Sequence, residues 1–80
     1  MQVSLNGSLR NGAGGASSIE LEAATIKELL NQLVERYPDM REHLDKGIAV
    51  AINGEVYRDD WTQPIPADAE VVLLPRIQGG

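Results

Sequence analysis

A single helical stripe over residues 26–37 most constrains how this chain can fold. Apolar residues recur there with the spacing of one helix face, and they are Ile26, Leu29, Leu30, Leu33, Val34 and Tyr37. Thr25 and Glu28 match a capping box at the start of the stripe. Pro38 ends it, because a residue before proline avoids the helical region. One amphipathic helix cannot bury its apolar face alone, so it must lie across a sheet.

Three segments around this helix, residues 2–5, 18–22 and 48–52, alternate in hydrophobicity at every second residue, which is typical of half-buried strands. The predicted strands are residues 2–5, 18–22, 48–52, 56–57 and 70–74. Asn53-Gly54 predicts a tight hairpin turn between the third strand and the fourth. Residues 8–15 are rich in glycine, so we expect a flexible hairpin loop between the first two strands. Residues 39–46 predict a short turn of helix or a loop.

The order of these elements predicts an α+β fold. The first and last strands are both apolar, and we expect them to run side by side and parallel in the sheet centre. This is a β-grasp, ubiquitin-like arrangement, with a mixed sheet of four to five strands and one main helix across one face. We expect one domain over residues 1–75 and a flexible C-terminal tail over residues 76–80, which ends in Gly79-Gly80.

The composition argues against several classes of function. A net charge of −5 repels phosphate backbones and anionic membrane surfaces, so we expect no nucleic-acid or membrane binding. The chain has no cysteine, which excludes disulfides, thiolate metal sites and a cysteine nucleophile. It shows no signal-peptide pattern and no run of about 20 apolar residues. We therefore expect a cytoplasmic protein that is monomeric when free.

The glycine pair at residues 79–80 is the main candidate for a functional site. Glycine has no Cβ, so Gly79 and Gly80 permit a thin tail to enter a narrow active-site channel. The carboxylate of Gly80 is ionised at neutral pH and is a poor electrophile. It becomes reactive in an acyl-adenylate made from ATP, and the sequence has no phosphate-binding loop, so a partner would supply that step. The alternative is an inert, glycine-rich end.

The strand before the tail offers a docking surface. Alternation along it places Val72 and Leu74 on the face away from the helix. An exposed Leu74 beside Pro75 and Ile77 would form a small apolar patch next to the reactive end. The alternative is that a loop covers Leu74.

Other candidate residues carry weaker signals. His43 is the single histidine and is expected at the surface, with no metal site around it. Asp59 and Asp60 could hold a cation or act as an acid pair, or could simply be solvated. Trp61 is either an interface anchor or a lid on the bottom of the core. Arg76 either pairs with an acidic residue of a partner or keeps the tail in solution.

Two segments and the terminal glycines resemble the MoaD/ThiS family, which contains the small molybdopterin synthase subunits and the sulfur carriers of thiazole synthesis. They are residues 50–56 (VAINGEV) and residues 65–75 (IPADAEVVLLP), followed by Gly79-Gly80. The family typically shows a "VNGE" hairpin, then "L-x-DGDEV", an apolar strand, a proline and a terminal Gly-Gly. Residues 66–70 lack the glycine of that turn, and residues 76–78 differ from the usual molybdopterin subunit, so the branch stays open.

The resemblance implies a sulfur carrier rather than an enzyme, or the small subunit of a synthase in the molybdopterin branch. An adenylating partner of the ubiquitin-activating type would activate Gly80 with ATP and Mg²⁺, while this chain binds no cofactor. A sulfur donor would then convert the carboxylate to a thiocarboxylate for a downstream biosynthetic synthase. Gly80 and Gly79 would be the reactive end. The expected partner-binding residues are Val72, Leu74, Pro75, Arg76, Ile77 and Gln78.

Two other functions remain open from the sequence. The activated tail could be joined to lysines of other proteins, which would make the chain a ubiquitin-like protein modifier. The chain could also be a plain interaction domain whose tail does nothing. The sulfur acceptor, whether a molybdopterin precursor, a thiazole or a cysteine precursor, is likewise open.

Overall fold

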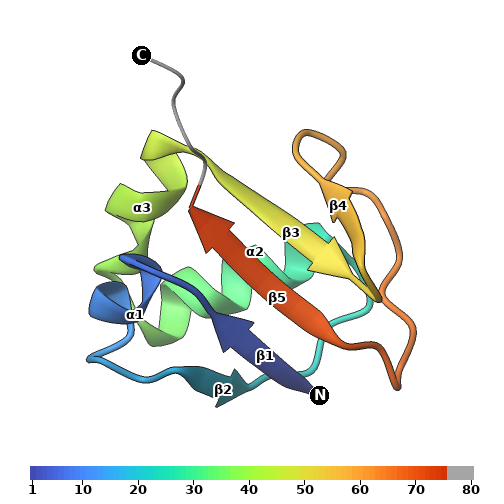
Figure 1. The fold of residues 1–80 in the computed structure, drawn as a ribbon, viewed down its shortest axis with the longest axis horizontal. Helices are drawn as coiled ribbons and strands as arrows, with labels where there is room; N and C mark the ends of the chain where they lie inside the picture. The colour runs from blue at the N-terminus through green and yellow to red at the C-terminus, as the bar shows by residue number, and fades with distance from the viewer. Residues whose placement is uncertain (76–80) are drawn as a thin grey trace.

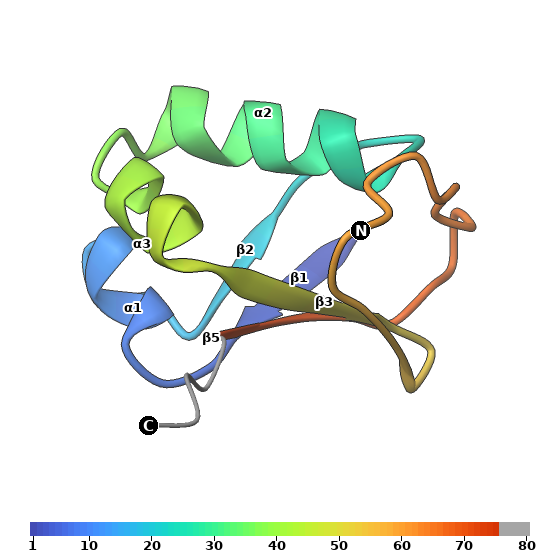
Figure 2. The ribbon, with the colours of Figure 1, turned by 90° about the horizontal axis from the view of Figure 1, so that it is seen from above.

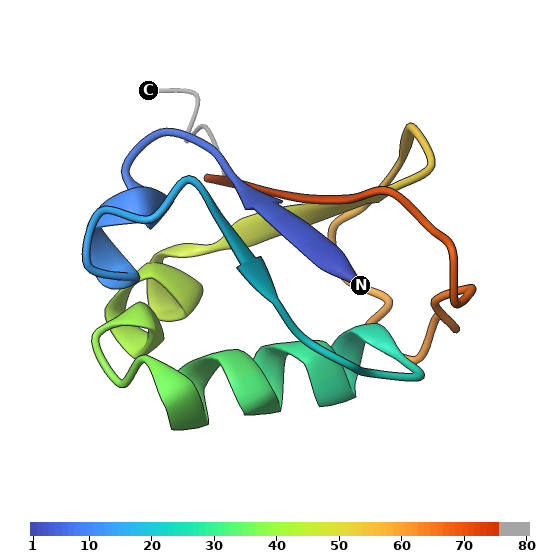
Figure 3. The same cartoon turned by 90° about the horizontal axis from the view of Figure 1, so that it is seen from below.

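The computed structural model describes residues 1–75, which form one five-stranded sheet with helices on one of its faces (Figures 1 and 2). The elements in chain order are β1 (Gln2–Leu5), α1 (Leu9–Gly12), β2 (Ser18–Glu20), α2 (Ile26–Arg36), α3 (Met40–Lys46), β3 (Ile48–Ile52), β4 (Glu55–Tyr57) and β5 (Val71–Pro75). Helix α2 crosses the sheet, and α1 and α3 lie beside each other near one of its ends (Figures 2 and 3).

The sheet has the strand order β2-β1-β5-β3-β4, so the last strand lies at its centre. Strands β1 and β5 are parallel, with Val3 opposite Val71, and the other pairs of neighbouring strands are antiparallel. The predicted α+β class, the mixed sheet and the parallel pairing of the first and last strands are therefore confirmed. These features are those of a β-grasp fold.

Helix α2 begins and ends where the sequence predicts. Thr25 is its N-cap in an extended conformation, and its Oγ1 accepts a hydrogen bond of 3.2 Å from the backbone N of Glu28. This bond satisfies one of the backbone donors that the first helical turn leaves free. At the other end, the backbone N of Tyr37 bonds to the carbonyl of Leu33, and Pro38 follows. The stripe buries four residues of the helix, namely Ile26, Leu29, Leu30 and Leu33.

The core lies between α2 and the inner face of the sheet, by which we mean the face that α2 covers. Val3, Val50, Val71, Leu33 and Leu73 are each 0% exposed in it. Burying an aliphatic side chain of this size contributes about 1.5–3 kcal/mol. The helix stripe and the alternating strand residues therefore hold the two layers together.

The expectation of a flexible loop over residues 8–15 is wrong. Leu9–Gly12 form the short helix α1, Leu9 is buried, and Ala13 is buried after it. A Cβ atom on Gly12 would lie 2.9 Å from Sδ of Met40 and 2.9 Å from Cδ2 of His43. Glycine is therefore needed at position 12 for close packing of α1 on α3, and not for flexibility.

The other connections agree with the sequence. Of the two expectations for residues 39–46, the structure has the helix, since α3 spans Met40–Lys46. Asn53 and Gly54 have φ angles of 51° and 87°, so the predicted hairpin turn with two positive φ angles is confirmed. Strand β4 follows this turn at one edge of the sheet, as predicted.

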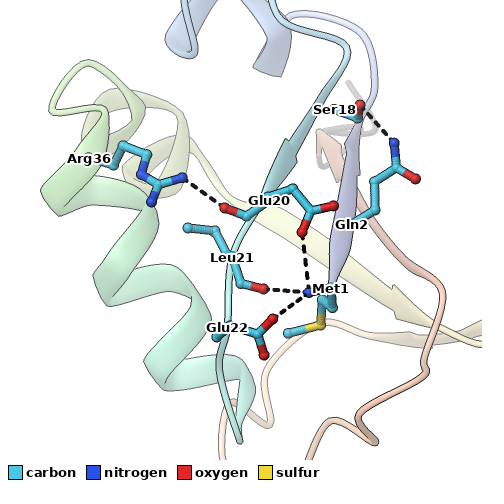
Figure 4. Close-up of polar contacts among 7 residues, drawn as sticks. All are labelled: Met1, Gln2, Ser18, Glu20, Leu21, Glu22 and Arg36. Carbon is cyan, nitrogen blue, oxygen red and sulfur yellow. Dashed lines mark hydrogen bonds and ion pairs between the residues drawn. The ribbon is translucent and has the colours of Figure 1, made fainter.

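The second strand is shorter than predicted, because β2 ends at Glu20 and not at residue 22. Side chains and the N-terminus take over its backbone bonding (Figure 4). Nη1 of Arg36 donates to the carbonyl of Glu20 at 2.7 Å, and the Met1 ammonium donates to the carbonyl of Leu21 at 3.0 Å. The same ammonium bonds to a carboxylate oxygen of Glu22 at 2.9 Å. The Arg36 contact occupies a carbonyl of β2, which hinders pairing of this edge of the sheet with another chain.

Candidate functional site

The predicted reactive end lies outside the described residues, and so do three of the predicted partner-binding residues. They are Arg76, Ile77, Gln78, Gly79 and Gly80. The structure does place Val72, Leu74 and Pro75, because all three belong to β5. The site is therefore built from the strand that leads into residues 76–80.

Side chains along β5 alternate between the two faces of the sheet. Val71 and Leu73 are fully buried under α2, whereas Val72 and Leu74 are half-buried. Because successive strand residues point to opposite faces, Val72 and Leu74 lie on the outer face, by which we mean the face opposite α2. Within residues 1–75 no helix covers this face (Figures 2 and 3). The expected face of Leu74 is therefore confirmed, whereas its side chain is half-buried and not exposed as expected.

The outer face has a polar half and an apolar half. Strands β1 and β2 place polar side chains on it, and they are Gln2, Ser4, Ser18 and Glu20. In the other half, Ala51 pairs with Val72 on one side and with Val56 on the other, while Ala49 pairs with Leu74. The apolar half thus extends from β5 across β3 to β4.

A shallow groove lies in the apolar half. It is lined by Asn6, Gly7, Ala49, Val56, Arg58, Leu74 and Pro75. Its floor is low at Ala49, whose small side chain lies between the larger ones of the neighbouring strands. Val56 is 48% exposed, and among the described residues it is the large hydrophobic side chain that is exposed. An exposed apolar side chain next to half-buried ones around a depression is typical of a protein-binding surface.

The groove adjoins the point where β5 ends. Pro75 pairs with Ile48 of β3, and on the other side the backbone N of Asn6 donates to the carbonyl of Leu73 at 3.0 Å. The end of β5 is therefore bonded on both sides, which fixes the position from which residue 76 continues. A partner seated in the groove would lie beside that position.

Sequence reasoning found Leu74 and Pro75 but missed the other residues of the groove. Ala49, Val56 and Arg58 come from β3 and from the segment around β4, so their neighbours depend on the strand order and the register. A signal was present, because Val56 and Arg58 alternate with Tyr57, which packs against the core. That parity alone places Val56 and Arg58 on the outer face.

The remaining candidates serve the fold. Trp61 is half-buried against the core, and its carbonyl accepts a bond from the backbone N of Lys27 at 2.8 Å. Of the two expectations for Trp61, the structure therefore agrees with a residue that closes the core. His43 lies in α3, half-buried next to Gly12 and not in an exposed turn. Within residues 1–75 no cluster of three or more histidine, cysteine or acidic residues could hold a metal ion.

Asp60 organises its own turn. One of its carboxylate oxygens accepts bonds from the backbone N of Thr62 at 3.1 Å and from Oγ1 of Thr62 at 2.5 Å. The other accepts a bond of 2.8 Å from Nε2 of Gln63. These bonds, those from Thr62 first, hold the pKa of Asp60 below its usual range. A carboxylate held in its ionised form in this way is a poor proton donor, so an acid pair with Asp59 is not supported.

None of the helices within the described range is long and apolar enough to cross a membrane.

Solved structures of similar proteins share this fold. SAMP1 from Haloferax volcanii is 25% identical with a TM-score of 0.79, and the match covers 99% of this chain and 97% of that one. CysO, in its complex with BexX from Amycolatopsis orientalis, is 25% identical with a TM-score of 0.78 over 99% and 98% of the two chains. A putative molybdopterin converting factor subunit 1 from Pyrococcus furiosus is 20% identical with a TM-score of 0.79 over 95% of each chain.

The sequence matches none of the curated proteins with which it was compared. The model of the ThiS family matches residues 3–80, which is almost the whole chain and includes the terminal glycines. The family expected from the sequence is therefore confirmed. The chain belongs to the ThiS family, a group of small ubiquitin-like sulfur carriers of the ThiS/MoaD type.

Proposed function

We propose that this protein carries sulfur as a thiocarboxylate on Gly80 for the biosynthesis of a cofactor or metabolite. The observation that carries the proposal is the family match over residues 3–80, which includes Gly79-Gly80. In this proposal residues 1–75 are the folded body, and residues 76–80 are the segment that enters the active site of a partner. The chain is a co-substrate and supplies no catalytic group of its own.

The chemistry takes two steps on the partner. A carboxylate oxygen of Gly80 attacks the α-phosphorus of ATP, and pyrophosphate leaves with Mg²⁺ balancing its charge. A sulfide equivalent from the sulfur donor then attacks the acyl carbon, so that a C–S bond forms, the C–O bond to AMP breaks and AMP leaves. The product is a thiocarboxylate that a downstream synthase can use as a sulfur source, in the manner of the molybdopterin or the thiazole branch.

The outer face supports the proposal that an adenylating enzyme of the ubiquitin-activating type docks there. Val72, Leu74 and Pro75 lie beside the exit of residue 76, and Val56 extends the apolar surface to the sheet edge. CysO, a similar protein, is described in a complex with BexX. We propose that Arg76, Ile77 and Gln78 continue the contact from Pro75 into the partner.

The test combines the purified chain with the adenylating enzyme of the same genome, ATP, Mg²⁺ and sulfide. Intact-mass spectrometry should show a mass gain equal to one sulfur replacing one oxygen, located on Gly80. A variant that lacks Gly79 and Gly80 is the matched control and should gain nothing. The proposal would be overturned if the mass of the wild-type chain stayed unchanged with an enzyme that catalyses the exchange of pyrophosphate into ATP.

A second candidate function is modification of other proteins. It is favoured by the likeness to SAMP1, which is described as a small archaeal modifier protein and is 25% identical to this chain. Gly80 would then form an isopeptide bond with lysines, and AMP would leave as before. Conjugates of higher mass on a denaturing gel, lost when Gly80 is deleted, would support this function over sulfur transfer.

A further inference from the structure

Among the described residues, the groove of the outer face is lined by one cationic side chain, that of Arg58. Arg58 follows β4, is exposed, and lines the groove together with Val56, Leu74 and Pro75. Within residues 1–75 no hydrogen bond or ion pair joins its guanidinium to another residue. The described lining of the groove contains no acidic residue either.

Arg58 is one of seven lysine and arginine residues in a chain whose net charge is −5. Its neighbours on the outer face are small or apolar, and Ala49 forms the floor between Leu74 and the strand that leads to Arg58. In the free protein the guanidinium is hydrated, and its lack of a protein partner costs little. A protein that covers Leu74 and Val56 must also remove water from Arg58.

A guanidinium that loses its water without gaining an acceptor is strongly unfavourable. A partner that fits this groove therefore has to place an acceptor against Arg58, and a carboxylate matches the planar donors of guanidinium best. The apolar walls of the groove also require an apolar side chain next to that carboxylate. Charge and shape together define one kind of binding segment.

We infer that Arg58 selects the activating partner of this carrier, by pairing with a carboxylate on a partner loop that inserts an apolar side chain over Ala49 between Val56 and Leu74. The inference rests on the proposed function and names the feature of the adenylating enzyme that this chain recognises. Arg58 acts in recognition and lies away from the chemistry at Gly80. It is therefore a specificity-determining residue and not a catalytic one.

The test measures binding and charging by the adenylating enzyme for variants of Arg58 and of Arg41. Arg58→Ala should raise the dissociation constant about tenfold. Arg58→Glu should raise it about a hundredfold, because the new carboxylate would face the carboxylate of the partner. Arg41→Glu is the matched control, since Arg41 is an exposed residue of α3, on the helix-covered side of the sheet, and the net charge changes equally. It should stay within about threefold of the wild type. Thermal unfolding checks that all variants fold, as expected for exposed positions.

Salt dependence separates an ion pair from lost packing. Raising the ionic strength should weaken wild-type binding, and this sensitivity should shrink in Arg58→Ala but not in Arg41→Ala. Mutating the paired carboxylate of the partner to a basic residue should restore binding of Arg58→Glu. The KM for the carrier should rise in the Arg58 variants while kcat stays near the wild-type value, because Gly80 chemistry is intact.

The inference is overturned if Arg58→Glu and Arg41→Glu bind equally well, or if the salt sensitivity of Arg58→Ala matches that of the wild type. Either result leaves the proposed function standing, provided that the wild-type chain still acquires sulfur. If the wild-type chain is not charged at all, the proposed function fails, and the inference fails with it.

Discussion

Gly7 lies directly against Pro75 at the end of the central strand. A Cβ atom at position 7 would be 3.3 Å from Cγ of Pro75, and Gly7 has a φ of 57°. Two independent reasons thus favour glycine there, one from backbone conformation and one from contact. The contact joins the turn after β1 to Pro75, the last of the described residues.

Gly7→Ala is expected to lower the free energy of unfolding by about 1–2 kcal/mol. It should also slow charging of Gly80 severalfold, because Pro75 must shift to make room. Gly14→Ala is the control, since Gly14 has a φ of 67° and nothing within 4 Å of its added Cβ. It should cost similar stability and leave charging unchanged. Equal charging of the two variants would show that Gly7 does not position the end of β5.

Substitutions on the two faces of β5 should affect stability and binding differently. Leu73 is 0% exposed under α2, so Leu73→Ala should cost about 2–5 kcal/mol of unfolding free energy in a urea titration. Leu74 is half-buried on the outer face, so Leu74→Ser should cost about 1 kcal/mol. Leu74→Ser should nevertheless weaken binding of the adenylating enzyme by at least about tenfold. Unweakened binding of Leu74→Ser would remove the outer face from the interface.

The N-cap of α2 gives a local test of the fold. Thr25→Ala removes the acceptor of the 3.2 Å bond from Glu28 and should cost about 1 kcal/mol. Ser17→Ala, at an exposed position outside the helices and strands, should change stability by only a few tenths of a kcal/mol. Chemical denaturation of both variants decides the comparison, and a similar loss in both would contradict a capping role.

Gly12 is expected to reject a side chain even though it lies in a helix. Alanine is the better helix former by about 1 kcal/mol. Its Cβ would meet Met40, which is 0% exposed and has little room to move. Overpacking of this kind costs about 1–3 kcal/mol, so Gly12→Ala should be destabilising overall. Asn11→Ala, at an exposed position of the same helix, should not be, and a stabilised Gly12→Ala would refute the close packing of α1 on α3.

The N-terminal ammonium should make stability depend on alkaline pH. Its pKa is raised above the ordinary value, first by the hydrogen bond to Glu22, with desolvation opposing and the charges of Glu22 and Glu20 adding to the effect. A raised pKa means that the ammonium contributes its full stability below about pH 8 and loses it as the pH rises through the folded-state pKa. Urea midpoints should therefore fall as the pH is raised above about 8.

Glu22→Gln should reduce that fall, because the main partner of the ammonium has lost its charge (Figure 4). Glu28→Gln, at an exposed position of α2, should leave the fall as it is in the wild type. The same slope in both variants and in the wild type would show that the Met1 contacts do not stabilise the fold.

Most of the fold could be predicted from periodicity. The α2 stripe, the five apolar strand segments and the turn at Asn53-Gly54 each depend on residues close in sequence, and each is confirmed, with β2 shorter than predicted. Helix α1 could not be predicted in this way. Its glycines suggested a loop, whereas Gly12 is required by contact with Met40 and His43, which lie about thirty residues further along the chain.

The residues of the candidate site likewise fall into those that the sequence could predict and those that depend on the fold. Leu74 and Val72 follow from alternation along one strand, so the sequence was sufficient for them. Val56 and Arg58 become their neighbours only through Ala51 and Ala49 of β3, which requires the strand order and the register. A one-residue slip of β4 would turn Val56 inward and remove it from the groove.

The parallel pairing of β1 with β5 links folding of the molecule to completion of its synthesis. Val3 leaves the ribosome early, but its partner Val71 appears only when most of the chain exists. A polypeptide interrupted before β5 lacks the strand with which both β1 and β3 pair, so its sheet falls into two unstable pieces. Such fragments would be open to proteolysis.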